Sequence, residues 1–277
     1  MRRTRISKNR AVSGIVTFLI LAIVFVGSGY LIGKFVLSSL LQRQPSGEPV
    51  SGDQTKPPGD SSVITAQIST KPMTLYRVQL GAFSSRENAD KTAAQAIQQG
   101  VPAGVMSPDP LHKVYCGVTS SKEAATKLSE NALPKLSGLV AKDDNLYVAT
   151  MDISANDFSI TGAKSTVEEL GQAFATIDNA MASLVGFWDS YYLGQETQVN
   201  LATMEQDITA VKDGLAKITP DTGTKTPHEI ALQLATDMEI AIKEARKVHG
   251  GDGSSATAGM TGLIKLVDEY VQSLKGL

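Results

Sequence analysis

The chain is poor in the residues that most often build metal centres and stabilising cross-links. Its 277 residues include one cysteine, Cys116, and three histidines, His112, His228 and His249. A single cysteine cannot form an internal disulfide or a cysteine-based zinc cage, and the histidines are too scattered to suggest a metal site. We expect Cys116 to be a small core residue and the histidines to be ordinary surface or loop residues.

Aromatic side chains and net charge are also scarce. Aromatics make up 5% of the chain and the formal net charge is −2, so no global field recruits nucleic acid or anionic lipid. No nucleophile–base pair, metal-ligand set or nucleotide loop stands out. The stretch HGGDGSSATAG (249–259) lacks the G-K-[ST] ending of a phosphate loop. We therefore expect no enzymatic activity, no cofactor and no metal.

The N-terminal region has the pattern of a membrane anchor. Residues 1–10 carry five cations and no acid, and residues 11–33 contain no charged side chain. About 20 apolar residues span a bilayer core as a helix. A cleaved signal peptide is the alternative, but it expects a shorter apolar run and a small-x-small site. The sequence predicts an uncleaved transmembrane helix over 11–33, with 1–10 cytoplasmic and the rest outside.

A segment of different composition follows the anchor. Residues 42–74 contain five prolines and few apolar side chains. Such a segment cannot bury enough surface to offset its ordering entropy. It predicts a flexible linker that holds a domain away from the membrane.

Residues 75–152 alternate between strand and helix patterns. The predicted order is β-α-β-β-α-β, with strands over 75–83, 101–106, 111–118 and 145–151. One helix lies between the first and second strands, and the other lies between the third and fourth. Two helices on one face of a four-stranded sheet leave the other face open, in an arrangement of the ferredoxin or RNP type. The predicted fold class is α+β.

This region contains one motif twice. GAFSSRENADK begins at Gly81 and GVTSSKEAATK at Gly117, and 6 of the 11 positions are identical. Ser84-x-x-Glu87 and Ser120-x-x-Glu123 both match the capping box, in which a hydroxyl and a carboxylate satisfy amides at a helix start. The repeat therefore predicts one structural joint used twice, without chemistry of its own.

Alternation places a set of side chains on the open face. From the first and third strands we expect Arg77, Gln79, Lys113 and Tyr115 there, with Phe83 at the strand exit.

The same residues carry a family resemblance. Tyr76-x-Val78-Gln79-x-Gly81-x-Phe83 precedes Arg86-Glu87-Asn88-Ala89, and Val114-x-x-Gly117 and Ser121-Lys122-Glu123-Ala124-Ala125 follow. In combination these motifs make residues 75–152 resemble the SPOR domain of bacterial envelope proteins. The resemblance implies a non-catalytic module that binds glycan strands stripped of stem peptides, on the open sheet face. Gln79 stands at the family's characteristic strand-one glutamine, whereas Tyr115 stands where arginine is frequent and Thr119 where an aromatic is common.

The side-chain chemistry fits that implication. Sugar rings present apolar faces and hydroxyl edges. Gln79 both donates and accepts hydrogen bonds, Arg77 and Lys113 donate, and Tyr115 and Phe83 offer flat apolar area. The sequence therefore predicts these five residues as a glycan-binding set. An aromatic at Phe83 could instead fill the seam between helix and sheet.

Residues 160–277 carry a helical pattern and no recognised family motif. Apolar residues repeat at 3,4 spacing in four runs, and boxes at Ser165-x-x-Glu168 and Thr226-x-x-Glu229 mark two starts. The first run, from Val167 to Tyr191, ends in an aromatic group with Trp188 and Tyr192 that could pack inside or dock a partner. Short connections favour an antiparallel bundle. A coiled-coil dimer through the first helix is the alternative.

Together these patterns predict a single-pass protein of the bacterial cell membrane. Its module would bind denuded peptidoglycan at division or sporulation sites, and its helical tail would recruit or brace a divisome or sporulation protein. The alternative function is a membrane-tethered scaffold whose sheet grips a protein and no glycan. Nucleic acid is not an expected partner, because the RNP1-type aromatic run is missing.

Overall fold

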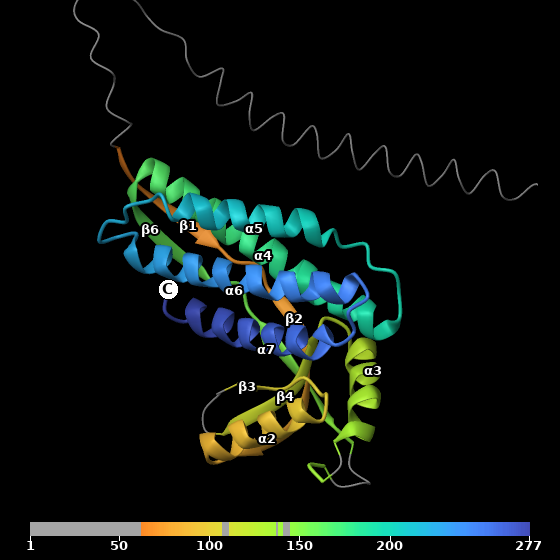
Figure 1. The fold of residues 1–277 in the computed structure, drawn as a ribbon. Coiled ribbons are helices and arrows are strands. Elements are labelled where there is room, and N and C mark those ends of the chain that lie inside the picture. The colour runs from red at the N-terminus through yellow and green to blue at the C-terminus, as the bar shows by residue number, and fades with distance from the viewer. Residues whose placement is uncertain (1–61, 107–110, 137, 141–144) are drawn as a thin grey trace, which may run out of the picture. The chain divides into compact units, whose positions relative to one another are not determined.

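The computed structural model describes residues 62–106, 111–136, 138–140 and 145–277, which belong to one compact unit (Figure 1). The predicted cytoplasmic segment 1–10, the span 11–33 and most of the linker lie outside the described residues. Within the described part of the chain, no helix combines the length and the apolar character needed to cross a membrane.

The predicted order of elements, β-α-β-β-α-β, is confirmed. Strands β2 (Met73–Phe83), β3 (Gly104–Met106), β4 (His112–Thr119) and β5 (Tyr147–Ile153) form an antiparallel sheet in the order β3-β4-β2-β5. Helices α2 (Arg86–Gln98) and α3 (Lys122–Ala132), followed by the 3-10 turn η1 (Leu133–Lys135), bury alanine-rich faces against it. Gly117 permits the approach of α3, because a Cβ there would stand 2.0 Å from Leu128 Cδ1.

The repeated motif caps both helices, but one residue later than predicted. Ser85 caps α2 by accepting from the Asn88 amide, and Ser121 caps α3 by accepting from the Ala124 amide at 3.1 Å. The second serine of each pair has the extended backbone of a cap residue. The first serine is therefore free for another role in each copy.

Two strands were not predicted. β1 (Val63–Ser69) and β6 (Asp157–Ala163) form an antiparallel ribbon, paired from Val63–Ala163 to Ser69–Asp157. The prediction of a flexible linker up to residue 74 was therefore wrong for β1, and residues 160–163 belong to a strand and not to the helical tail. β1 gains order by pairing with a strand 88 to 100 positions away in the sequence, and by packing on α4 (Lys164–Leu193), the first long helix of the tail.

The tail contains the four predicted helices. They are α4 (Lys164–Leu193), α5 (Leu201–Leu215), α6 (Lys225–His249) and α7 (Ser255–Leu274), and consecutive helices pack together (Figure 1). The apolar stripe of α4 is buried within its own chain against α5, α6 and the β1–β6 ribbon. The boxes at Ser165 and Thr226 do not cap, because α4 begins after Ala163 and α6 after Thr224, without a side-chain cap bond.

The second face of the sheet is covered over β3 and β4, which corrects the prediction of a fully open face. α7 packs along β3 and β4 on the face opposite α2, so the sheet lies between these two helices (Figure 1). A Cβ on Gly104 would lie 2.7 Å from Ile264 Cγ2, so glycine in β3 allows α7 to approach closely. The physical reason is that α7 carries a buried apolar residue, Ile264, on the side that faces β3, besides the apolar residues that face the bundle.

Candidate functional site: the partly covered sheet face

Gln79 occupies the centre of the sheet face that was predicted to bind glycan. It pairs with Tyr115 of β4 on one side and with Tyr147 of β5 on the other. The register of β2 and β4 shifts on both sides of Gln79, since Val78 pairs with Gly117 and Gly81 with Val114. Such a double irregularity increases local twist and redirects side chains. It leaves a glutamine amide flanked by two tyrosines from neighbouring strands.

Tyr115 lies in the interior under α7. It has no exposed surface, and the guanidinium of Arg77 stacks over its ring at 4.6 Å from the centroid. Burial raises the pKa of the Tyr115 hydroxyl, and the charge of Arg77 partly opposes this. In this conformation Tyr115 cannot stack on a ligand, so the prediction of an accessible Tyr115 was wrong.

Arg77 is half-buried at the edge of the α7 contact. Its Nη1 lies 3.9 Å from Met106 Sδ, and its Nε is buried without a hydrogen-bond partner among the described residues. On α7, a hydrogen bond to Gln272 lowers the pKa of the Asp268 carboxyl group, and the positive charges of Arg86, Lys275 and Arg77 lower it further. Burial raises the pKa of Asp268 more than these groups lower it.

The other two predicted residues lie apart from this centre. Lys113, half-buried, pairs with Ala82 and with Met106 and belongs by alternation to the face of Tyr115. Phe83 pairs with His112, one position beyond the Ala82–Lys113 pair, so its ring projects from the opposite face. There it packs against the core, as expected for a residue that fills the helix–sheet seam. The structure thus brings Arg77, Gln79 and Tyr115 together and excludes Phe83.

Sequence reasoning missed Tyr147. This residue is 66% exposed and stands beside Gln79 in register, at the outer edge of the sheet. Because Gln79 pairs with both Tyr147 and Tyr115, the two tyrosines belong to the same face of the sheet. The signal was present in the sequence, because alternation along NLYVATM places Tyr147 and Ala149 on one face. Without strand register, nothing linked that face to Gln79.

Cys116 is a core residue, as predicted. It is completely buried, and burial raises the pKa of its thiol far above the ordinary value. A thiol in this state is not a reactive group.

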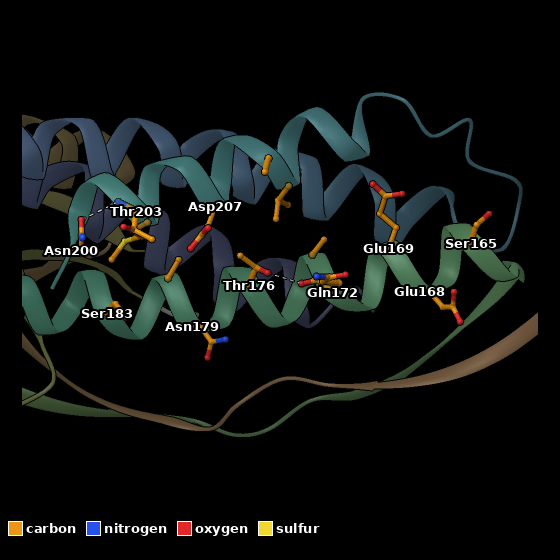
Figure 2. A pocket seen from close by; sticks show the side chains of 15 residues that line it. Ser165, Glu168, Glu169, Gln172, Thr176, Asn179, Ser183, Asn200, Thr203 and Asp207 are labelled. Carbon is orange, nitrogen blue, oxygen red and sulfur yellow. Dashed lines mark hydrogen bonds between the residues drawn. The ribbon is translucent and has the colours of Figure 1, made fainter. Parts of the chain in front are cut away.

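A groove of about 1050 Å³ runs between α4 and α5 (Figure 2). Alanine, serine and threonine line much of it. Its charged lining residues are Glu168, Glu169 and Asp207, and its amides are Gln172, Asn179 and Asn200. The groove lies outside the α/β module, so any partner that it binds would contact the helical tail alone.

The matches to known proteins fall on the α/β module. The SPOR domain family matches residues 72–142, and the solution structure of the peptidoglycan binding domain of the B. subtilis cell wall lytic enzyme CwlC matches at 32% sequence identity. That match covers 29% of this chain and 91% of the CwlC domain, with a TM-score of 0.23. The chain belongs to the SPOR domain family.

Membership in the SPOR family rests on sequence. The matched residues include β2, α2, β3, β4, α3 and η1, and the helices α4–α7 lie outside the family match. No curated protein shows a significant match to the chain. The SPOR module therefore carries the functional information, and the tail must be read from its physical chemistry.

Proposed function

We propose that the SPOR module binds peptidoglycan glycan strands through the uncovered strip of its sheet, formed by Gln79 and Tyr147. The observation that carries this proposal is the 66% exposed ring of Tyr147 beside the half-buried amide of Gln79. An exposed aromatic next to a group that donates and accepts suits a sugar, whose ring face stacks while its hydroxyls form hydrogen bonds. CwlC, whose similar domain is named as peptidoglycan binding, supports the same ligand class.

The cation beside the strip favours strands without stem peptides. Removal of a stem peptide by an amidase leaves a carboxylate on the lactyl group of the glycan. Arg77 lies two positions from Gln79 on the same strand and face, and an arginine forms strong charge-assisted bonds to a carboxylate. Amidase-treated strands should therefore bind better than intact ones.

The cellular setting that we propose follows from the sequence. A span at 11–33 would tether the chain to the bacterial cell membrane, with the module outside and at denuded septal or sporulation peptidoglycan. The tail would then engage a division or sporulation protein.

The test is co-sedimentation of the full chain with purified sacculi, with and without amidase pretreatment. Gln79→Ala and Tyr147→Ala should each weaken binding by about five- to tenfold, equivalent to about 1–1.4 kcal/mol. Thr150→Ala is the matched control, because Thr150 is exposed on β5, the strand of Tyr147, but lies on the opposite face of the sheet. Binding that neither variant changes, or that does not increase after amidase treatment, would refute this site.

The second candidate function is an interaction scaffold without glycan binding. The groove between α4 and α5 favours it, because its charged lining is wholly acidic and would suit a cationic protein segment (Figure 2). The substitution Asp207→Asn separates the two functions. It should leave binding to sacculi unchanged if Gln79 and Tyr147 form the site, and should weaken binding to a protein partner if the groove holds one.

A further inference from the structure

The side of α7 that faces the sheet is half polar. Thr257 Oγ1 donates to the carbonyl of Gly100 at 3.3 Å, and Thr261 Oγ1 accepts from the Ala103 amide at 3.2 Å. Ile264 approaches Gly104, and Asp268 lies within the field of Arg77. These four residues follow one another at 4, 3 and 4 positions and so form one stripe on the helix. Such a stripe can be exposed to water at lower cost than a fully apolar one.

The opposite side of α7 holds it to the bundle. Met260, Leu263, Val267 and Tyr270 are buried, and Tyr270 donates to Asp178 of α4 at 2.6 Å. α7 also packs extensively on α6. Loss of the sheet contact would therefore leave α7 folded against α4 and α6.

The contact between α7 and the sheet leaves polar groups unsatisfied. The Tyr115 hydroxyl and Arg77 Nε are both buried and lack hydrogen-bond partners among the described residues. Permanent cores rarely contain such groups, because each one loses its bonds to water without replacement. The Tyr115 hydroxyl and Arg77 Nε lie on the face that also carries Gln79. We interpret this face as a binding surface for a polar ligand, which is absent while α7 covers the face.

We propose that α7 is an autoinhibitory cover, which occupies the β3–β4 half of the glycan-binding face and must separate from the sheet for a strand to use the whole face. The inference rests on the proposed glycan binding and adds its regulation. In the covered form a strand reaches Gln79, Tyr147 and the exposed part of Arg77. In the uncovered form Tyr115 and Lys113 complete the platform, and the Tyr115 hydroxyl and Arg77 Nε obtain the hydrogen-bond partners that α7 denies them.

A reversible lock tests this proposal. An ideal Cβ at Gly104 lies 3.2 Å from Ile264 Cβ, slightly less than the separation of about 3.5–4.5 Å between the Cβ atoms of a disulfide, so a small outward shift of α7 allows the bond. The double substitution Gly104→Cys and Ile264→Cys should therefore tie α7 to β3 under oxidising conditions. The native Cys116 should not interfere, because it is buried. The full chain with the lock closed should bind amidase-treated sacculi at least about tenfold more weakly than the same chain after reduction, as expected if the competent state is rarely populated.

A second variant pushes the same contact open. Gly104→Val adds bulk against Ile264, and valine suits a strand, so α7 should separate more readily and binding should become several-fold tighter. Hydrogen exchange at the Ala103 amide, whose acceptor is Thr261, measures the separation without any glycan. It should be slowed by the lock and accelerated by Gly104→Val.

The outcomes distinguish the cover from the glycan site itself. Equal binding by the oxidised and reduced double variant would overturn the cover and leave the proposed function intact. Unchanged binding by Gly104→Val, despite faster exchange at Ala103, would do the same. Absence of binding in every form, including the reduced one, would overturn both proposals.

Discussion

At the scale of single residues, the buried hydroxyl of Tyr115 is a cost to the covered conformation. It is buried under α7 and lacks a hydrogen-bond partner among the described residues. Tyr115→Phe removes only this hydroxyl and keeps the ring beneath Arg77. We expect the free energy of unfolding to rise by about 1 kcal/mol, measured by urea denaturation.

The same substitution should act in the opposite direction on binding. If the uncovered face uses the Tyr115 hydroxyl, Tyr115→Phe should weaken binding to sacculi while it stabilises the fold. A fall in stability would show that the hydroxyl has a partner in solution. Tyr115→Ala is not informative, because it leaves a large cavity in the core.

Glu239 provides a test of stability against pH. Its side chain is 11% exposed and pairs with Lys212 of α5 and, at 2.6 Å, with Lys243 of α6. These two lysines lower the pKa of Glu239. Because the folded pKa lies below the unfolded one, the stabilisation is present above the ordinary value of about 4.3 and is lost as the pH falls through the folded pKa.

Glu239→Gln should therefore lower the free energy of unfolding by about 1 kcal/mol at pH 7, and by much less near pH 3. Thermal unfolding across this pH range measures the difference. The matched control is Glu130→Gln, which breaks the exposed pair with Lys127 and should change stability by about 0.5 kcal/mol or less. A difference for Glu239→Gln that does not depend on pH would contradict the role of its charge.

At the scale of elements, the two copies of the repeated motif form different contacts. Ser120, the first serine of the second copy, donates its amide and hydroxyl to the carboxylate of Asp189 in α4, at 2.9 and 2.7 Å. Ser84, its counterpart in the first copy, is exposed. One copy therefore closes a helix cap, and the other also docks the SPOR module onto the tail.

This asymmetry predicts unequal effects of the same substitution. Ser120→Ala should lower the free energy of unfolding by about 1 kcal/mol, and Ser84→Ala should leave it nearly unchanged. In a chain that already carries Asp189→Ala, Ser120→Ala should add little further cost. Chemical denaturation of the four variants measures the coupling, and independent effects of Ser120 and Asp189 would disprove the docking bond.

Local patterns predicted elements well where short-range physics decides them. The 3,4 spacing in α4 placed Val167, Phe174 and Trp188 correctly in the core, because helix periodicity alone fixes which side is apolar. The cap positions were wrong by one residue. The first serine of each pair matches the S-x-x-E pattern, but the second serine forms the cap bond, which needs only a hydroxyl at the helix start. β1 was missed because its order comes from pairing with β6, far along the chain.

At the scale of the whole molecule, the candidate site depended on contacts that no local pattern contains. Gln79 was predicted from the family resemblance and lies at the centre of the face. Tyr147 joins it only through the register of β5 with β2, and Tyr115 is lost only through the docking of α7. Alternation identifies the face to which a side chain belongs, whereas the cover over that face depends on a helix about 150 residues later.

The short connection from β1 to β2 has a mechanical consequence. Thr70 and Asn156 exchange hydrogen bonds of 3.0 and 2.9 Å at this junction, and the Lys71 amide donates to Asp178 at 2.8 Å. β2 carries Gln79, so a pull between a membrane tether and a bound glycan strand would travel lengthwise through β1, this junction and β2. The load would shear the β1–β6 ribbon instead of unzipping it, and many backbone bonds would share the force. The chain would then act as a tension-bearing link between membrane and wall, with the helical tail attached beside the line of force.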